Sequence, residues 1–439
     1  MRLLLALIAA VVGFGVLPVG SDAPASAQEA GGEEVIVILD EGEDPVAVAA
    51  ELGVELTHVY EEVFTGFAGT LPADAVTEAA SARSVRRIFL DGPVQAEAQT
   101  VPTGVRRAGV PTENGTNRLA VDSPVNADIA ILDTGVTRRN DLRVAGGKDC
   151  VDPKKKKKKK KGKKGNNDKK SKKEKRRQRR ERRRTKPWED DNGHGTHTAG
   201  IAAAIDNDAG VVGVAPGARI WAVKVLDAGG GGTFGDVICG LDWVVKRQAT
   251  IDVVNLSLSG AGSDGPCSNT PFHQAICNVV NAGIPVVVAA GNQGTSAGAR
   301  VPAAYDEVIT VSGLADSDGA PGKDGPTTCS GYGDDTFLPF SNDGPDVDIM
   351  APGDCILSLS NRGEPVRESG TSAASPHVAG AAAHFIAQEL AATGERPTPQ
   401  QTQMWLETEA SRSQAVDGVT GDDDGNPEPV LWLEVLDEP

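Results

Sequence analysis

The amino-acid sequence predicts a large α/β domain, with a mostly parallel sheet and helices on both faces, preceded by a small ferredoxin-like α+β domain. Two observations support this prediction. From about residue 127, apolar runs without polar alternation take turns with helical segments, as in sheets that are buried on both faces. Between residues 35 and 91, shorter segments follow the order βαββαβ.

In the small domain, the first strand is the apolar run VIVILD (35–40). The following helix has a proline near its start and a glycine at its end. The remaining expectations are one or two strands within 56–71, a helix at 73–82, a strand at 85–91 and a polar linker at 92–104.

In the large domain, predicted strands and helices alternate along most of the sequence. Repeated β–α units of this kind indicate one mostly parallel sheet. Strands are predicted at 128–136, 218–227, 251–260, 284–292 and 308–316, and helices at 194–205, 234–248, 271–283, 372–393 and 398–410. In such sheets, functional sites form at the carboxyl ends of the strands.

The net charge of −17 hides an asymmetry. Residues 154–186 hold 23 of the 44 Lys and Arg residues and only three acids, a net charge of +20, so the rest of the chain carries −37. An acidic body repels phosphates and argues against a nucleic-acid-binding protein. It suits a soluble secreted protein.

The N-terminus has the pattern of a signal peptide at 1–27. Arg2 supplies the positive end, residues 3–17 are apolar, and Ala25-Ser26-Ala27 offers a small-residue cleavage site. A buried first helix is the alternative. No later segment is long and apolar enough to cross a bilayer, so a released product is expected.

Six cysteines in an exported chain favour disulfides over free thiols. We predict a bond between Cys267 and Cys277, which would close a short polar loop, and next a bond between Cys329 and Cys355. Neither a CxxC motif nor the spacing of a zinc knuckle occurs.

Acyl transfer needs a nucleophile, a base, a group that orients the base, and donors for the oxyanion. The chain offers Ser372 in SGTSAASPHVAG, His194 in DNGHGTHTAG, Asp133 in LDTGV and Asn292 in AAGNQG. Each alone is commonly a cap or a turn residue. HGTH is not HExxH, so a metalloprotease is not supported.

These strings, in the order Asp, His, Asn, Ser, resemble those of the subtilisin-like serine proteases over roughly residues 99–439. The resemblance implies that Ser372 is the nucleophile, His194 the general base, Asp133 its orienting partner, and Asn292 with the Ser372 N–H the oxyanion hole. His197 and His377 match structural positions. No cofactor is expected for catalysis. Calcium often stabilises this family, and the acidic loop 421–426 is a possible site whose spacing is not diagnostic.

The resemblance further implies that substrate binds as an added strand along Ser257, Leu258 and Gly260. Ala290 and Gly291 would line the wall of the primary specificity pocket, with 228–232 as the opposite rim. Residues 28–98 resemble the propeptide of these proteases, an inhibitor and folding aid that the enzyme removes by cutting within 92–103. A permanent accessory domain is the alternative.

The basic run 154–186 interrupts a loop that joins the Asp strand to the His helix. It lacks apolar periodicity, and its like charges favour an extended, solvated chain. It is a bystander, a weak and salt-sensitive tether to polyanions, or a sequence error or recent repeat expansion. The overall expectation is a monomeric secreted serine endopeptidase made as a zymogen; the alternative is a catalytically silent binder tethered by the basic loop.

Overall fold

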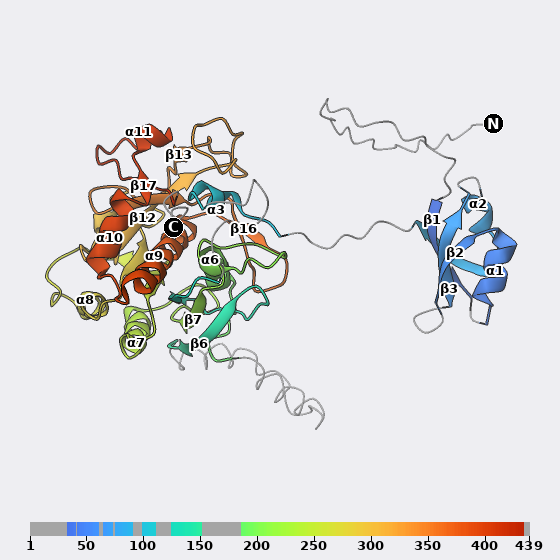
Figure 1. Cartoon of the computed structure of the whole chain (residues 1–439), viewed down its shortest axis with the longest axis horizontal. Coiled ribbons are helices and arrows are strands. Elements are labelled where there is room, and N and C mark those ends of the chain that lie inside the picture. The colour runs from blue at the N-terminus through green and yellow to red at the C-terminus, as the bar shows by residue number, and fades with distance from the viewer. Residues whose placement is uncertain are drawn as a thin grey trace, which may run out of the picture. The chain divides into compact units, whose positions relative to one another are not determined.

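The computed structural model describes residues 33–40, 42–60, 65–72, 75–90, 99–110, 124–151 and 186–433. The chain divides into two compact units, Met1–Ala96 and Glu97–Pro439 (Figure 1). Three predicted segments lie outside the described residues: the signal peptide, residues 91–98 of the linker, and residues 154–185 of the basic run. Most of the predicted cleavage region falls within the second of these.

The first unit has the predicted βαββαβ order and an antiparallel sheet in the order β2-β3-β1-β4. Asp44 caps the first helix by accepting the Val46 N–H at 2.9 Å, and Gly53 ends that helix in the left-handed region. The helix predicted at 73–82 is shorter than expected. The elements are β1 (Glu33–Leu39), α1 (Pro45–Leu52), β2 (Glu55–Tyr60), β3 (Gly66–Leu71), α2 (Val76–Ala79) and β4 (Val85–Leu90).

The second unit is built on one large sheet, whose central path runs β17-β18-β14-β12-β10-β8-β5-β7-β6. From β14 to β6 every neighbouring pair is parallel. Its strands on this path are β5 (Asp128–Asp133), β6 (Arg143–Asp149), β7 (Arg219–Lys224), β8 (Val253–Leu256), β10 (Val286–Ala289), β12 (Ile309–Ala315), β14 (Ile349–Pro352), β17 (Ser411–Arg412) and β18 (Val430–Leu431). The predicted parallel sheet is confirmed, whereas β6 and β14 were not predicted.

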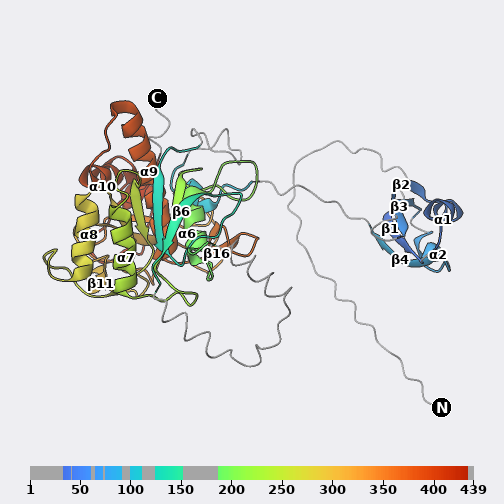
Figure 2. The same cartoon turned by 90° about the horizontal axis from the view of Figure 1, so that it is seen from below.

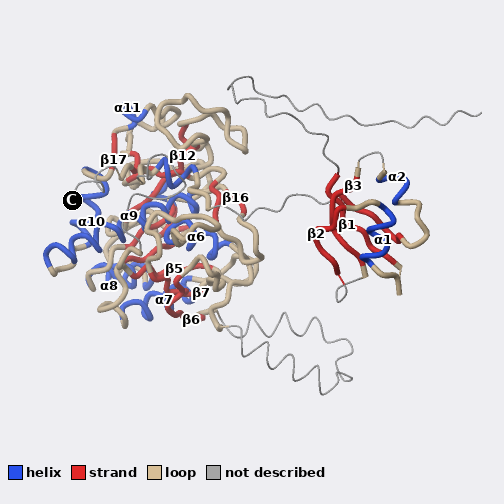
Figure 3. Tube along the Cα trace, turned by 45° about the vertical axis from the view of Figure 1, so that its right-hand side comes forward, coloured by secondary structure: helices blue, strands red, loops and turns tan. Residues whose placement is uncertain are grey.

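Helices cover both faces of this sheet. The major helices are α6 (His194–Ala203), α7 (Phe234–Val245), α8 (Pro271–Asn281), α9 (Thr371–Thr393) and α10 (Pro399–Thr408). Figures 1 and 2 show α7 and α8 side by side, and the strands of the sheet lie among the helices in Figure 3. The shorter elements are α3 (Thr103–Arg107), α11 (Gln414–Asp417), the 3₁₀ turn η2 (Ala297–Ala299), β9 (Gly260–Ala261), β11 (Arg300–Val301), β13 (Thr336–Phe337), β15 (Ile356–Ser358) and β16 (Val366–Glu368).

Alternate residues of β5 explain why that strand shows no polar alternation. Ile129 and Ile131 join the apolar core formed with α6, α9 and α10, whereas Ala130 and Leu132 join the core formed with α7 and α8. Because successive side chains of a strand point to opposite faces, a strand between two helical layers must be apolar throughout.

Three disulfides are present, including both predicted pairs, Cys267–Cys277 and Cys329–Cys355. The third joins Cys150, which follows β6, to Cys239 in α7. Within the residues that the structure describes, no helix combines the length and the apolar character that a membrane span requires.

Candidate active site

The predicted catalytic residues meet because adjacent parallel strands end at the same edge of the sheet. Asp133 is the last residue of β5, and Asn292 follows β10 by three residues; β8 lies between these strands. His194 is the first residue of α6 and Ser372 the second residue of α9, and both helices pack on the same face of the sheet.

The centre of the site is a hydrogen-bonded pair. Nδ1 of His194 lies 2.8 Å from Oδ2 and 2.9 Å from Oδ1 of Asp133. The Asp133 side chain is fully buried, whereas that of His194 is 28% exposed. The carboxylate of Asp133 raises the pKa of His194 to about 9, and the charges of Glu368 and Asp190 act in the same direction. This arrangement fixes the imidazole ring and leaves Nε2 for proton transfer.

Asp190 holds the turn that presents His194. Its Oδ1 accepts the N–H groups of Asn192 and Gly193 at 2.9 Å, and its Oδ2 accepts the N–H of Thr196 at 3.0 Å and its hydroxyl at 2.6 Å. Thr134, next to Asp133, donates to Asp190 at 2.9 Å and accepts the Gly195 N–H at 2.9 Å. This network ties the end of β5 directly to the start of α6.

Ser372 is half-buried at the start of α9. Its carbonyl accepts a hydrogen bond from the Ser257 hydroxyl at 2.8 Å, and Asn255 Nδ2 donates to that hydroxyl at 2.9 Å. Gly370, which precedes the helix, has φ of 151°. A Cβ at Gly370 would lie 3.0 Å from Ser372 Oγ and 3.2 Å from Asn292 Nδ2, so the serine hydroxyl and the asparagine amide border the same small space.

Thr371 determines the orientation of the Asn292 amide. Asn292 Oδ1 accepts the Thr371 N–H at 2.8 Å and the Thr371 hydroxyl at 3.0 Å. The same hydroxyl accepts the Gly291 N–H at 3.1 Å. Because the carbonyl side of the amide is occupied, its NH₂ group is directed toward the space beside Ser372.

Within the described residues, His194 makes no hydrogen bond to the Ser372 hydroxyl. Without substrate, catalytic hydrogen bonds are often long, and they shorten when the substrate is bound. The structure therefore brings the four predicted catalytic residues close together. Of their mutual contacts, the hydrogen bond between Asp133 and His194 is already formed. The other two histidines of these strings, His197 and His377, are buried, and each donates a ring N–H to a main-chain carbonyl group, as expected for structural residues.

The predicted substrate-binding residues have different surroundings. The Ser257 side chain is buried, and its hydroxyl bonds to Asn255 and to the Ser372 carbonyl; Leu258 is half-buried. Gly260 lies opposite Val301 in the short β9–β11 ladder, where a Cβ would meet the tip of the Phe234 ring at 2.6 Å, so a larger residue would require this exposed ring to move. Ala290 is fully buried, and Gly291 has φ of 109°. Their roles toward substrate stay predictions.

Asp190, Thr134 and Thr371 were not predicted from the sequence, and their hydrogen bonds orient the predicted catalytic groups. The signals that could have identified them were their positions, four residues before His194, directly after Asp133 and directly before Ser372. Lys224 was not predicted from the sequence either. Its buried ammonium group donates to the Asp191 carboxylate at 2.6 Å and to the carbonyl of Thr134, the residue that follows Asp133.

The acidic loop 421–426 does not bring together a set of cation ligands. Asp424 accepts the N–H groups of Gly344 and Asn426 at 2.6 Å, and Asp422 accepts the side-chain amide of Gln414 at 2.5 Å. Among the described carboxylates, the group that converges is Asp316, Asp318 and Asp334, and backbone N–H groups already donate to each of these. The structure gives calcium at the predicted loop no direct support.

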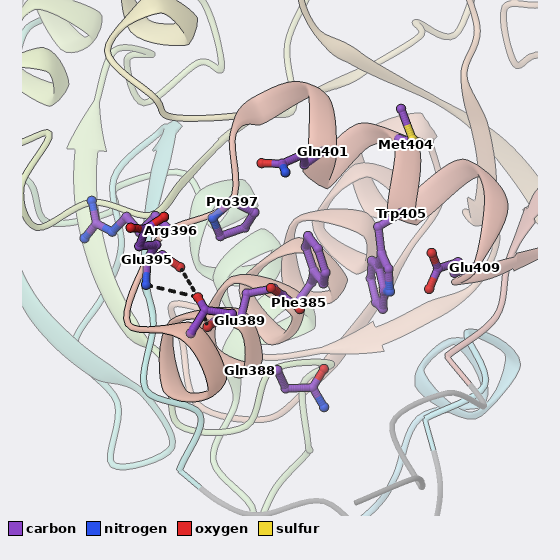
Figure 4. Close-up of a pocket in the computed structure, with 11 residues that line it drawn as sticks. Phe385, Gln388, Glu389, Glu395, Arg396, Pro397, Gln401, Met404, Trp405 and Glu409 are labelled. Atoms are coloured by element: carbon purple, nitrogen blue, oxygen red, sulfur yellow. Dashed lines mark hydrogen bonds between the residues drawn. The ribbon is translucent and has the colours of Figure 1, made fainter.

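A pocket of about 500 Å³ lies elsewhere, between the end of α9 and α10 (Figure 4). The stacked rings of Phe385 and Trp405, 4.6 Å apart, form part of its wall. None of the predicted catalytic residues lines it. This pocket is therefore separate from the predicted catalytic residues.

The fold and the gathered polar groups define a class, the α/β proteins with a site at the carboxyl edge of a parallel sheet. Comparisons with known proteins identify the family to which the chain belongs. The model of the subtilase family matches residues 126–425. A thermostable alkaline protease of Halalkalibacterium halodurans is 31% identical over 360 residues, which cover 82% of each chain. The chain therefore belongs to the subtilase family of serine endopeptidases.

Other relatives agree. Subtilisin DY of Bacillus licheniformis is 39% identical over 202 residues, 45% of this chain and 65% of that protein. Subtilisin E of Bacillus subtilis is 37% identical over 207 residues, 46% of this chain and 48% of that protein. The chain thus matches about half to two thirds of the length of these relatives. The crystal structure of a cold adapted subtilisin-like serine proteinase superposes with a TM-score of 0.55 and 26% identity, covering 76% of this chain and 98% of that one.

Proposed function

We propose that this chain is a secreted serine endopeptidase that hydrolyses peptide bonds with Ser372, His194 and Asp133 and is made as a self-processed zymogen. The observation that carries the proposal is the hydrogen bond of 2.8 Å between His194 Nδ1 and Asp133 Oδ2, at the sheet edge where Ser372 is the second residue of α9. A buried carboxylate paired with a part-exposed imidazole beside a serine is the arrangement that activates a hydroxyl.

In the proposed reaction, His194 takes the Ser372 proton while Oγ attacks the scissile carbonyl carbon. His194 then gives that proton to the leaving amine, and the ester that remains is hydrolysed by water through the same steps. Asp133 stabilises the imidazolium at each stage and keeps the ring in one orientation. No metal or cofactor takes part in these steps.

The oxyanion is proposed to accept hydrogen bonds from Asn292 Nδ2 and the Ser372 N–H. The position of Ser372 in the first turn of a 23-residue helix supports this assignment, because unpaired N–H groups and the helix dipole both favour negative charge there. The orientation of the Asn292 amide by Thr371 supports it independently.

Substrate is proposed to pair with the chain along Ser257, Leu258 and Gly260, with Ala290 and Gly291 at the primary pocket. The first unit is proposed to act as the propeptide and inhibitor, and the chain is proposed to be exported after loss of residues 1–27. The membership of the large unit in the subtilase family, and the compact βαββαβ fold of the first unit, support these steps. The mature enzyme is proposed to be a monomer, with weak polyanion binding through 154–186.

A direct test compares purified wild-type protein with Ser372→Ala on a diverse peptide library. Wild-type protein should lose its first unit, label with a fluorophosphonate and cleave peptides, and the cleaved bonds would define the pocket preference. Apart from loss of the signal peptide, Ser372→Ala should keep its first unit, and it should neither label with the fluorophosphonate nor cleave peptides. Equal cleavage by both proteins would show that Ser372 is not the nucleophile.

A further inference from the structure

A second cluster of reactive side chains surrounds the disulfide Cys267–Cys277. One ligand atom from each of Cys267, Cys277, His273 and Glu307 lies within 4.8 Å of all the others. We call these four residues the Cys267 cluster. None of them has a part in the proposed hydrolysis.

Helix α8 and a neighbouring turn build this cluster. His273 and Cys277 are four residues apart in α8, so their side chains lie on the same face of the helix. Thr270 caps that helix by accepting the His273 N–H at 3.1 Å, which fixes the turn carrying the histidine. Cys267 approaches from the preceding loop.

The polar contacts converge on Glu307. Its Oε2 lies 2.8 Å from His273 Nε2, and its Oε1 lies 3.3 Å from the Cys267 sulfur. A further carboxylate oxygen, of Asp264, is 3.7 Å from His273 Nε2. The side chains of Glu307 and Asp264 are 30% and 34% exposed, so the cluster is open to solvent on their side.

His273 is held rigidly and is not fully satisfied. Its side chain is 1% exposed, and its ring stacks on Tyr305 with centroids 3.8 Å apart and planes at 1°. Its Nδ1 is buried and has no hydrogen-bond partner among the described residues. An imidazole fixed beside a carboxylate and two sulfur atoms is the donor combination that borderline-soft divalent metals prefer.

We propose that, when the Cys267–Cys277 bond is reduced, this cluster binds a zinc-class divalent cation through two thiolates, one imidazole and one carboxylate. Zinc takes sulfur at about 2.3 Å and nitrogen or oxygen at about 2.0–2.2 Å in a tetrahedron, which places ligand atoms roughly 3.3–3.8 Å apart. The four ligand atoms already lie within 4.8 Å of one another, and the two sulfurs, 2.09 Å apart in the disulfide, must separate to reach this spacing. The metal would take the place of the proton that His273 Nε2 shares with Glu307, and that proton would move to His273 Nδ1, so the ring stays neutral.

The chemistry balances with a thiol or phosphine as reductant. A phosphine gives two electrons to the S–S bond and takes an oxygen atom from water, whose two protons end on the two sulfurs. Binding of the divalent cation then releases both protons. The cysteines are also thiols when the chain is synthesised, so metal and disulfide are alternative cross-links between the loop and α8. The Cys-x9-Cys spacing is not that of a zinc knuckle, so the site was not predicted from the sequence.

The test uses full-length protein carrying Ser372→Ala, so that self-digestion cannot remove material. The protein is reduced with a phosphine and titrated with Co²⁺, whose absorption distinguishes tetrahedral thiolate ligation. We expect one Co²⁺ per reduced chain, displaced by Zn²⁺, and none with these bands in the oxidised chain. Cys267→Ser with Cys277→Ser should abolish the bands, and His273→Ala and Glu307→Gln should each weaken binding.

Cys329→Ser with Cys355→Ser is the matched control, since that disulfide belongs to no such cluster among the described residues, and it should bind as the parent does. Co²⁺ binding that is equally tight in His273→Ala and Glu307→Gln would overturn the proposal. If reduction unfolds the chain, Zn²⁺ should restore the thermal transition; failure both to bind and to refold would overturn it as well. These outcomes do not depend on protease activity.

Discussion

At the scale of single residues, the site depends on groups that hold the catalytic side chains in place. The imidazole of His194 is oriented by Asp133, and the amide of Asn292 by Thr371. The catalytic candidates were predicted from their strings in the sequence, and the structure brings them close together. Their orienting contacts could not be predicted, because Asp190 and Thr371 look like ordinary cap residues until the chain brings β5, β10 and two helix starts together.

The ion pair should set the pH dependence of catalysis. The charge of Asp133 raises the pKa of His194 to about 9, and only the neutral imidazole can act as a base. We expect kcat/KM to rise with pH through a midpoint above 6.5. Asp133→Asn should lower kcat by on the order of 10⁴-fold and move that midpoint to lower pH.

This prediction is tested by the pH profile of kcat/KM for the wild-type protein and for Asp133→Asn. The same midpoint in both proteins would contradict the assignment.

The pair of Asp133 and His194 also has a predictable effect on stability. Because the folded pKa of His194 is raised, its stabilisation is complete below about pH 6.5 and is lost as the pH rises through about 9.

Thr371 provides a test of amide positioning that leaves the catalytic residues intact. Thr371→Val removes the hydroxyl that bonds Asn292 Oδ1 at 3.0 Å, and we expect kcat to fall about tenfold, the equivalent of one hydrogen bond. Thr371→Ser keeps the hydroxyl and should retain most of the activity. Steady-state kinetics distinguish the two, and equal losses in both variants would indicate a steric cause instead.

At the scale of elements, the short helix α3 is anchored by a buried charge cluster. Arg107 is fully buried and pairs with Asp335 at 2.7 Å and with Asp417, while Asp316 lies 3.7 Å away. These partners come from the loop after β12, the turn before β13 and helix α11. The sequence could not predict this cluster, because Arg107 is more than 200 residues from each of its acidic partners.

Arg107→Met should destabilise the second unit by about 3–5 kcal/mol, since the acids would be left buried without a countercharge. Burial already raises the pKa of Asp316 to about 8. A raised acid pKa means that the folded state retains the proton, so stability falls as pH rises. The loss should therefore be greater at pH 9 than at pH 6 in urea unfolding, and a loss independent of pH would argue against the charge explanation.

At the scale of the whole molecule, an acidic body carries a separate basic run. The two charge blocks largely cancel in the net value of −17, yet the body alone is at −37. In the sequence, the run lies between β6 (Arg143–Asp149) and α6 (His194–Ala203). That it is an insertion into the loop between these elements stays a prediction.

Deletion of residues 154–185 should leave cleavage of short peptides within about twofold of wild type. It should abolish binding to an immobilised polyanion at low salt, because that binding depends on charge and counterion release. The wild-type protein should elute from such a resin as salt rises. Loss of peptide cleavage after deletion would show that the run supports the fold or the site.

The sequence alone determined the parallel-sheet class, the order of its main elements, two disulfides and the identity of the catalytic candidates. These follow from local patterns: apolar runs, helix-start residues and short glycine-rich strings. Only the tertiary structure decided which groups touch. The Asp133–His194 bond, the Thr371–Asn292 contact, the disulfide between Cys150 and Cys239, and the Arg107 cluster all join residues far apart in the chain, and no local pattern specifies such contacts. The contact of Glu307 with His273 also depends on the tertiary structure.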